Sequence, residues 1–299
     1  MASRYSVRSI SMPPRSHPSA LTVEESLSKL KALWDSSSTL KGEKMCIGLA
    51  GLVELYNSVE DLLHLPITQQ TLMDLHECEK WADEVLEGSV RLLDVCSTTR
   101  DLLLQMKGHV HDLQSALRRK GGEAAEKDME VDAYICFRKM MKTDLTKCLK
   151  ELKSIGDSSA ILLLIPHQSE HHHKLQKISR VLKESREITI STFQSLISIM
   201  SVPIKAKPSR WLLVSKLMHN RQLTGEIREA EDLGLACVDN ALYALTKQDE
   251  KENEMENVLK AHKGLEALEA AIEGIQVWLD CIFRQLIQNR VSLLNIFTQ

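Results

Sequence analysis

The sequence predicts an all-α protein: an elongated antiparallel bundle of about six helices with long central and C-terminal helices. Two segments carry continuous apolar spacing of the helical kind, one from Leu75 to Leu117 and one from Leu265 to Ile296. The 299 residues include only 12 glycines and 7 prolines. An α/β enzyme of this size needs more glycine for its turns and phosphate-binding loops, so this composition favours helices.

The central segment organises the rest of the chain. Steps of alternately three and four residues along it meet only uncharged side chains, which are Leu75, Cys78, Ala82, Val85, Ser89, Leu92, Cys96, Thr99, Leu103, Met106, Val110, Leu113 and Leu117. This spacing indicates one helix of roughly 65 Å with a continuous buried face. The basic residues Arg118 to Lys120 and the glycines that follow, Gly121 and Gly122, suit the end of that helix.

The composition limits which functions and which cellular compartment the protein can have. The net charge of −3 argues against a general nucleic-acid-binding protein, which would have a basic excess. No apolar run approaches the ~20 residues that a membrane-spanning helix needs. The 7 cysteines are scattered without a C-x-x-C motif, and Cys78, Cys96, Cys148 and Cys281 fall on apolar faces. Buried thiols of this kind indicate a reducing compartment, and we expect a cytoplasmic protein.

Residues 1–20 differ in composition from the rest of the chain. They are rich in arginine, serine and proline and contain no acidic residue, so we expect a disordered arm before a single helical bundle domain at 21–299. Such an arm is also similar to a transit peptide, which makes organelle targeting the alternative localisation. Pro13, Pro14 and Pro18 would interrupt an amphipathic targeting helix early.

The same arm contains a candidate partner motif. Arg8, Ser9, Ser11 and Pro13 fit the pattern R-S-x-S-x-P, which resembles a phosphoserine motif bound by 14-3-3 proteins. Phosphorylation of Ser11 would add about −1.5 to −2 charges for an arginine cluster of the partner to bind. The alternative is a Ser/Arg-rich tail that matches a short pattern by chance.

The first two helices precede the central one. Thr22 and Glu25 form a candidate capping box for the first helix. The second helix carries apolar residues from Leu49 to Leu63 and is expected to end before Pro66, with Thr68 as the cap of the central helix. The short connection predicts that the second helix runs antiparallel to the central helix.

The next helix is expected to follow the glycines and to continue to about Leu152. Its segment 138–153 has a basic face that includes Lys139, Lys142, Lys147, Lys150 and Lys153. A basic face can meet anionic lipid, so a peripheral membrane-surface protein is the alternative function. An ordinary solvated face is the other interpretation, because Asp144 and Glu151 are interspersed.

The second half begins with a variable insert near 156–173. A helix at 174–200, a basic linker near 203–210, a short helix at 211–217 and a helix near 233–245 follow. The C-terminal helix has one polar interruption at Asn289, a residue type that often sets the register between helices. Its length matches that of the central helix, so we expect the two to pack together within one monomer.

The sequence contains no recognisable catalytic or cofactor-binding residues. Loops of the types G-x-G-x-x-G and G-x-x-x-x-G-K-[ST] and the motifs H-E-x-x-H and G-x-S-x-G are absent from the sequence. His167, His171, His172 and His173 form a cluster in the insert, and a spacing of four can place two metal ligands on one helix face. Pro166 and the lack of a nearby cysteine favour a solvated polar turn. We therefore predict a protein that is not an enzyme and holds neither metal nor cofactor.

Several ordered motifs resemble a plant-specific family related to the BYPASS proteins. They are Ser16-His17-Pro18, Leu65-Pro66 with Thr68-Gln69-Gln70, the run from Ser89 to Cys96, the run from Gln114 to Arg119, the run from Trp211 to Met218 and the run from Arg290 to Ile296. The resemblance implies a helical protein without known catalysis. It also implies a role in root and shoot development, in restraining a mobile root-derived signal. We expect an interaction or regulatory protein, whose protein partner the sequence does not name. The insert at 160–173 departs from the family pattern.

Overall fold

The computed structural model describes residues 18–36, 41–73, 79–119, 124–158, 170–202, 234–246 and 254–298. Helices account for 96% of these residues, and none of them forms a strand. The predicted all-α fold is confirmed. The eight helices are α1 (Pro18–Asp35), α2 (Lys41–Leu63), α3 (Pro66–Met73), α4 (Glu79–Arg118), α5 (Ala124–Ser158), α6 (Glu170–Met200), α8 (Leu235–Thr246) and α9 (Glu254–Phe297).

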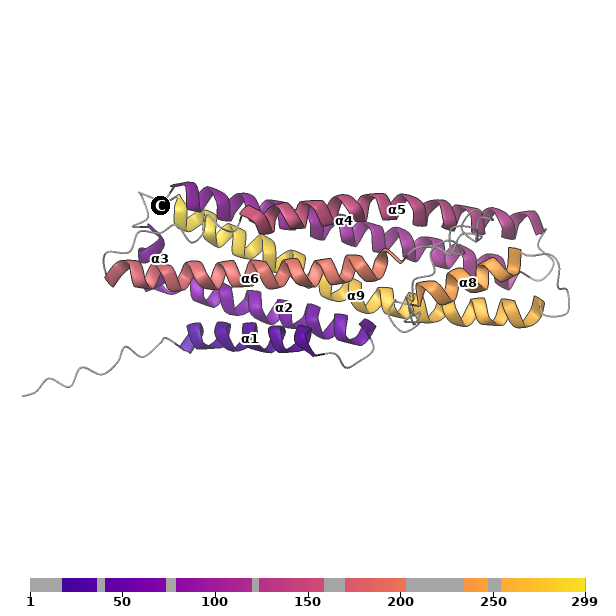
Figure 1. Cartoon of the computed structure of the whole chain (residues 1–299), viewed down its shortest axis with the longest axis horizontal. Coiled ribbons are helices and arrows are strands. Elements are labelled where there is room, and N and C mark those ends of the chain that lie inside the picture. The colour runs from indigo at the N-terminus through magenta and orange to yellow at the C-terminus, as the bar shows by residue number, and fades with distance from the viewer. Residues whose placement is uncertain are drawn as a thin grey trace, which may run out of the picture.

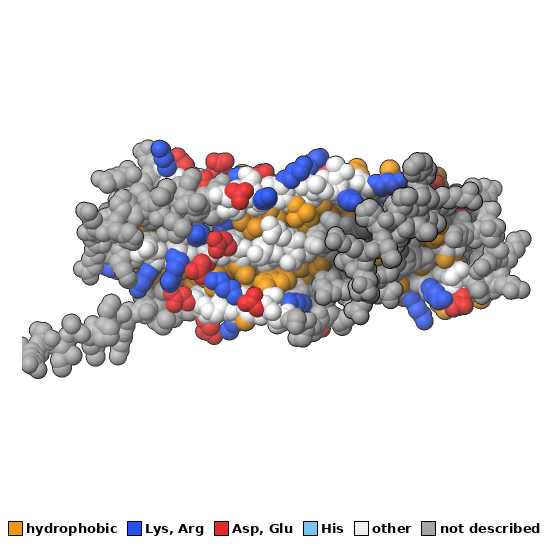
Figure 2. Space-filling model, in the orientation of Figure 1, with side chains coloured by type: hydrophobic (Ala, Val, Ile, Leu, Met, Phe, Trp, Pro, Cys, Tyr) orange, Lys and Arg blue, Asp and Glu red, His pale blue; other side chains and the backbone are white. Residues whose placement is uncertain are grey.

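The long helices lie along one axis and form an elongated bundle (Figure 1). In this bundle α9 packs between α2 and α4, α5 packs on α4, and α1 packs on α2. The remaining long helix, α6, contacts α1, α2 and α5, and α8 packs on one end of α9. The face with α6 at its centre carries charges of both signs, with apolar side chains between them (Figure 2).

Residue pairs between neighbouring helices give their directions. Arg100 pairs with Asp280 at 2.6 Å and Lys107 with Glu273 at 2.7 Å, so α4 and α9 are antiparallel. The C-terminal helix therefore packs beside the central helix, as predicted. The amide of Asn289 donates to the backbone oxygen of Tyr56 at 3.1 Å, while the sulfur of Cys46 lies 3.6 Å from the Cβ position at Gly274. Thus α2 runs parallel to α9 and antiparallel to α4, with α9 as its main neighbour instead of α4.

The apolar face predicted for the central helix is buried in the structure. Val85, Leu92, Leu103 and other members of the series belong to a hydrophobic core shared by all eight helices, whereas Ala82, Ser89 and Leu117 are half-buried. Leu75 and Cys78 lie outside the described residues. The small side chains of the series permit close helix approach, and Cys96 Sγ lies 3.9 Å from the backbone oxygen of Leu279 on α9.

Two predicted helix caps are wrong. Helix α1 begins at Pro18, so Thr22 lies inside it. Proline suits a first helical turn because its missing N–H has no partner to lose there. Pro66 likewise starts a separate short helix, α3, and Thr68 is buried within it instead of capping α4.

Boundaries also differ around the insert. Helix α5 continues through Gly156 to Ser158, and α6 begins at Glu170, earlier than predicted. The backbone of His171, His172 and His173 therefore lies at the start of α6, while His167 lies outside the described residues. The basic linker at 203–210, the short helix expected at 211–217 and the arm up to residue 17 also lie outside them.

The cysteines agree in part with the predicted apolar faces. Cys96 and Cys148 are buried, Cys281 is half-buried, and Cys136 and Cys237 are exposed. Burial raises the pKa of the Cys96 thiol to about 12, so this thiol stays protonated at neutral pH. No helix in the described ranges combines the length and the low polarity that crossing a membrane requires.

Candidate functional site: a polar cavity inside the bundle

A cavity of about 50 Å³ lies where α2, α4, α6 and α9 meet. By this measure a water molecule occupies about 10–15 Å³, so the cavity has room for a few waters. Half of its lining is apolar. The polar half consists of Tyr56, Ser89, Ser185, Arg186, Asn289 and Arg290.

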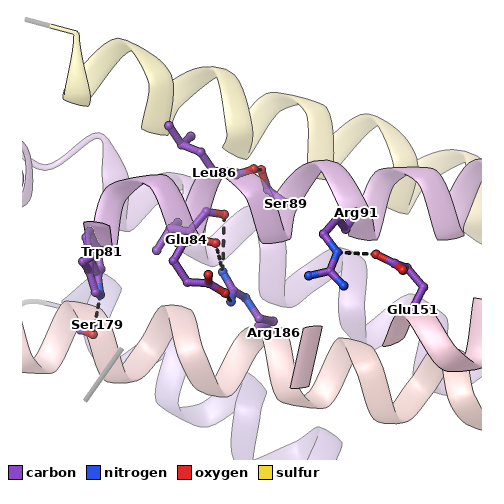
Figure 3. Close-up of polar contacts among 9 residues, drawn as sticks. Trp81, Glu84, Leu86, Ser89, Arg91, Glu151, Ser179 and Arg186 are labelled. Atoms are coloured by element: carbon purple, nitrogen blue, oxygen red, sulfur yellow. Dashed lines mark hydrogen bonds and ion pairs between the residues drawn. The ribbon is translucent and has the colours of Figure 1, made fainter. Parts of the chain in front are cut away.

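Arg186 reaches from α6 to the backbone of α4 (Figure 3). Its Nη2 donates to the backbone oxygen of Glu84 at 3.1 Å and of Val85 at 3.5 Å, and its Nη1 lies 3.5 Å from Glu84 Oε1. The side chain is only 7% exposed. Burial lowers the pKa of Arg186, which the carboxylate of Glu84 partly opposes. An arginine remains charged even so, and the site keeps a buried cation.

Gly88 makes room for this guanidinium. A Cβ atom at position 88 would lie 2.7 Å from Arg186 Cζ, well inside van der Waals contact. Glycine costs a helix interior about 0.5–1 kcal/mol relative to alanine. Its place in the middle of α4 therefore has a reason in packing, because a larger residue would displace the arginine.

Arg290 brings a second cation to the cavity from α9. Its Nη1 donates to Ser89 Oγ at 2.7 Å and to the backbone oxygen of Leu86. Within the described part of the chain, no carboxylate pairs with Arg290. Both of its acceptors are neutral, so its positive charge is not balanced by a neighbouring side chain.

Two buried polar atoms of the lining have no hydrogen-bond partner: Ser185 Oγ and Asn289 Oδ1. The amide nitrogen of Asn289 donates to the backbone oxygens of Tyr56 and Gln285, both at 3.1 Å. Both acceptors are carbonyl oxygens, so they fix the orientation of the amide and leave Oδ1 as the free acceptor. Unpartnered groups of this kind cost about 1–3 kcal/mol each unless a bound molecule satisfies them.

Tyr56 completes the polar lining from α2. Its hydroxyl lies 2.9 Å from Thr189 Oγ1, and Thr189 donates its own proton to the backbone oxygen of Ser185 at 2.7 Å. The Tyr56 hydroxyl is therefore the donor in this pair. Burial raises the pKa of Tyr56 to about 12, which keeps it neutral.

Further polar contacts hold α4 in place on either side of the cavity (Figure 3). Trp81 Nε1 donates to Ser179 Oγ of α6 at 3.1 Å, and the Trp81 ring meets Phe297 edge to face. Arg91 forms an ion pair with Glu151 of α5. These contacts fix the helices that supply the two arginines.

A second buried arginine lies toward the other end of the bundle and forms what we call the Arg138 cluster. Arg138 of α5 donates to the backbone oxygens of Met200 at 3.1 Å and Val202 at 2.8 Å, and pairs with Asp239 of α8 at 3.2 Å. Tyr134 donates to the same carboxylate at 2.9 Å. Arg138 is thus buried on the inner face of α5. The lysines of the basic face are exposed as predicted: Lys139, Lys142, Lys147, Lys150 and Lys153.

The residues predicted from the sequence as candidate partner-binding or metal-binding sites are not those of the cavity. Arg8, Ser9, Ser11 and Pro13 lie outside the described residues. Within the described ranges no group of three or more His, Cys, Asp or Glu side chains is arranged to hold a metal ion. The local signal for the cavity was Gly88 in the middle of a strong helical pattern, together with Asn289 as the single polar residue of the C-terminal apolar series.

Comparison with known proteins shows a match to a protein family. The family model described as Protein BPS1 matches residues 48–296, a range that begins inside α2 and ends near the end of α9. It includes every residue that lines the cavity. Neither the curated proteins nor the solved structures contain a match to this chain.

Proposed function

We propose, from the premise that this chain belongs to the Protein BPS1 family of plant proteins, that it is a non-enzymatic regulatory protein of root and shoot development. It acts by binding another protein. The family match over residues 48–296 is the observation that carries this proposal.

The outer surface of α4 and α9 supports binding to a protein. Leu104 and Val277 are 62% and 61% exposed. They lie between two ion pairs that join the same helices, Arg100–Asp280 on one side and Lys107–Glu273 on the other. An apolar centre with a polar rim is the usual composition of a protein-binding surface.

Affinity purification from plant tissue with mass spectrometry tests the proposal. We expect the wild-type chain to retain a reproducible partner and the double variant Leu104→Glu, Val277→Glu to lose it. Both positions are exposed, so these changes should alter stability by no more than about 0.5 kcal/mol each. Met140→Glu is the matched control, because Met140 is 51% exposed on a different helix, α5. Absence of any specific partner would refute the proposed function.

A 14-3-3 protein is the partner that we propose for the arm. The pattern at Arg8, Ser9, Ser11 and Pro13 supports it. We expect a peptide covering Arg4 to His17 to bind a plant 14-3-3 protein when Ser11 is phosphorylated and not otherwise, as measured by calorimetry. Equal binding of the two peptides, or none, would remove this partner and leave the bundle surface.

The membrane-surface alternative rests on the exposed lysines of α5. Liposome co-sedimentation with and without anionic lipid separates it from protein binding. We expect no lipid-dependent sedimentation. Binding that disappears when Lys139, Lys142, Lys150 and Lys153 are changed to glutamine would favour the alternative instead.

A further inference from the structure

We propose that the cavity between α2, α4, α6 and α9 is a binding site for a small anion that contains a phosphate group. This inference goes beyond the regulatory function proposed above and does not depend on it. The charge, the unpartnered atoms and the size of the cavity each lead to this class of ligand.

The charge of the lining favours an anion. Its charged members are Arg186 and Arg290, and none of the described lining residues is acidic. The nearest carboxylate known to bind one of them is that of Glu84, which lies 3.5 Å from Arg186 Nη1. Of the two arginines only Arg186 thus has a carboxylate partner, and the arginine without one is Arg290. Planar guanidinium groups are the side chains best suited to phosphate oxygens.

The unpartnered atoms favour an oxyanion that also carries a hydroxyl group. Ser185 Oγ is a donor that an anionic oxygen can satisfy; the atom is buried, and the residue is 2% exposed. Asn289 Oδ1 is an acceptor, and it needs an O–H or N–H donor from the ligand. Monohydrogen phosphate offers both, with three acceptor oxygens and one hydroxyl. Chloride offers no donor and leaves Asn289 unpartnered.

The size of the cavity limits the ligand. Its volume of about 50 Å³ equals that of about four water molecules, which corresponds to the four oxygens of one tetrahedral anion. A phosphorylated sugar or nucleotide does not fit in that space. Free phosphate is therefore the expected source, and a phosphomonoester enters only where its remainder extends out of the cavity.

Binding at this place would join helices that are far apart in the sequence. Arg186 comes from α6, Arg290 and Asn289 from α9, and the backbone atoms that orient Arg186 from α4. A ligand that binds only the folded arrangement stabilises it in proportion to the logarithm of its concentration. Phosphate would thereby couple the packing of these helices to its own level in the cell.

Calorimetric titration of the full chain with inorganic phosphate tests the proposal, with chloride added to equal ionic strength as the reference. We expect saturable heat with phosphate and none with chloride. Arg290→Gln should weaken phosphate affinity at least tenfold, whereas Arg290→Lys, which keeps the charge, should weaken it less. Arg284→Gln is the matched control, because Arg284 is exposed on the same helix and lies outside the cavity.

The outcomes separate clearly. The absence of phosphate heat in the folded wild type, or an equal affinity in Arg290→Gln and wild type, would overturn the site. Equal heats for phosphate and chloride would overturn its selectivity for an oxyanion. Glycerol phosphate forms a second arm. If glycerol phosphate does not bind, the site is specific for free phosphate. If it competes with phosphate, the oxyanion site is confirmed, but its ligand is an esterified phosphate instead of the free phosphate expected here.

Discussion

Arg138 and Arg186 are both buried cations between helices, but their surroundings differ. In the Arg138 cluster the carboxylate of Asp239 is as buried as the arginine, at 4% against 1% exposure, and Tyr134 binds it as well. The backbone oxygens that Arg138 binds are those of Met200, the last residue of α6, and of Val202 just beyond it, where the helix dipole is negative. Its Nε alone has no partner.

At the cavity the positive charges and the polar atoms are only partly matched by protein partners. Arg186 has one carboxylate, at 3.5 Å and partly exposed, and beside it lie a second arginine and two unpartnered polar atoms. The Arg138 cluster pairs its own charges and holds helices together. The cavity lining leaves donors, an acceptor and a positive charge facing a cavity, an arrangement that suits the binding of a ligand. The predictions below test this distinction.

The largest effect is expected from Asp239→Asn. Removing one charge of a buried ion pair leaves Arg138 uncompensated and should lower the free energy of unfolding by about 3–5 kcal/mol. Glu84→Gln should lower it less, because Glu84 is more exposed and contacts Arg186 at a longer distance. Urea unfolding of the two variants measures both. Equal losses would show that the two carboxylates stabilise their arginines to the same extent, which would contradict the comparison.

A pair of glycine substitutions on α4 gives the next effect. Gly88→Ala should destabilise the protein by about 1–3 kcal/mol, because its Cβ would overlap the Arg186 guanidinium. Gly108→Ala should instead stabilise it by up to about 1 kcal/mol, because no atom lies within 4 Å of that Cβ and alanine favours a helix. Opposite shifts in thermal unfolding are expected. A shift of the same sign in both would contradict the packing at Gly88.

The cavity region should also respond to alkaline pH. Burial raises the pKa of Cys96 from 9.0 to about 12 and that of Tyr56 from 10.0 to about 12. Above pH 9 the unfolded chain loses these protons and the folded chain keeps them, so stability decreases as pH rises from about 9 to 12. At pH 10 the loss should be about 2 kcal/mol. Urea unfolding at several pH values measures it, and Cys96→Ala should flatten the profile.

Ser185→Ala should have the smallest effect. In phosphate-free buffer the change removes an unpartnered buried hydroxyl, so we expect between about 0 and 1 kcal/mol of stabilisation. Tyr134→Phe is the counterpart in the Arg138 cluster and should cost about 1 kcal/mol, because it removes a bond to Asp239. Chemical unfolding of both variants compares them. A comparable loss in Ser185→Ala would mean that its hydroxyl is satisfied inside the protein.

What the sequence predicts well is the pattern that repeats along one helix. The apolar series of α4 and α9 are recognisable because each buried residue has a neighbour of the same kind three or four positions away. Asn289 stands out as the polar exception for the same reason. The structure shows that it binds the backbone of α2.

The contacts of the buried arginines could not be found in this way. Arg138 lies at the apolar spacing of α5, but its partners Met200, Val202 and Asp239 are at least 62 residues away in the sequence. Arg186 of α6 likewise depends on Gly88 of α4, a residue far from it in the sequence. Periodicity shows which face of a helix is buried. It carries no information about which residues of other helices that face contacts. The helix starts at Pro18 and Pro66 differ from the prediction because proline, which interrupts a helix, also suits its first turn.

The position of α9 has a consequence for how the chain is made. This helix lies between α2 and α4, yet it is C-terminal to every helix with which it packs. A ribosome adds about 5–20 residues per second, so α2 and α4 emerge many seconds before the helix that separates them. During that interval the faces of α2 and α4 that pack on α9 lack their native partner. The nascent chain must therefore either remain open or be protected by a chaperone until α9 has been synthesised.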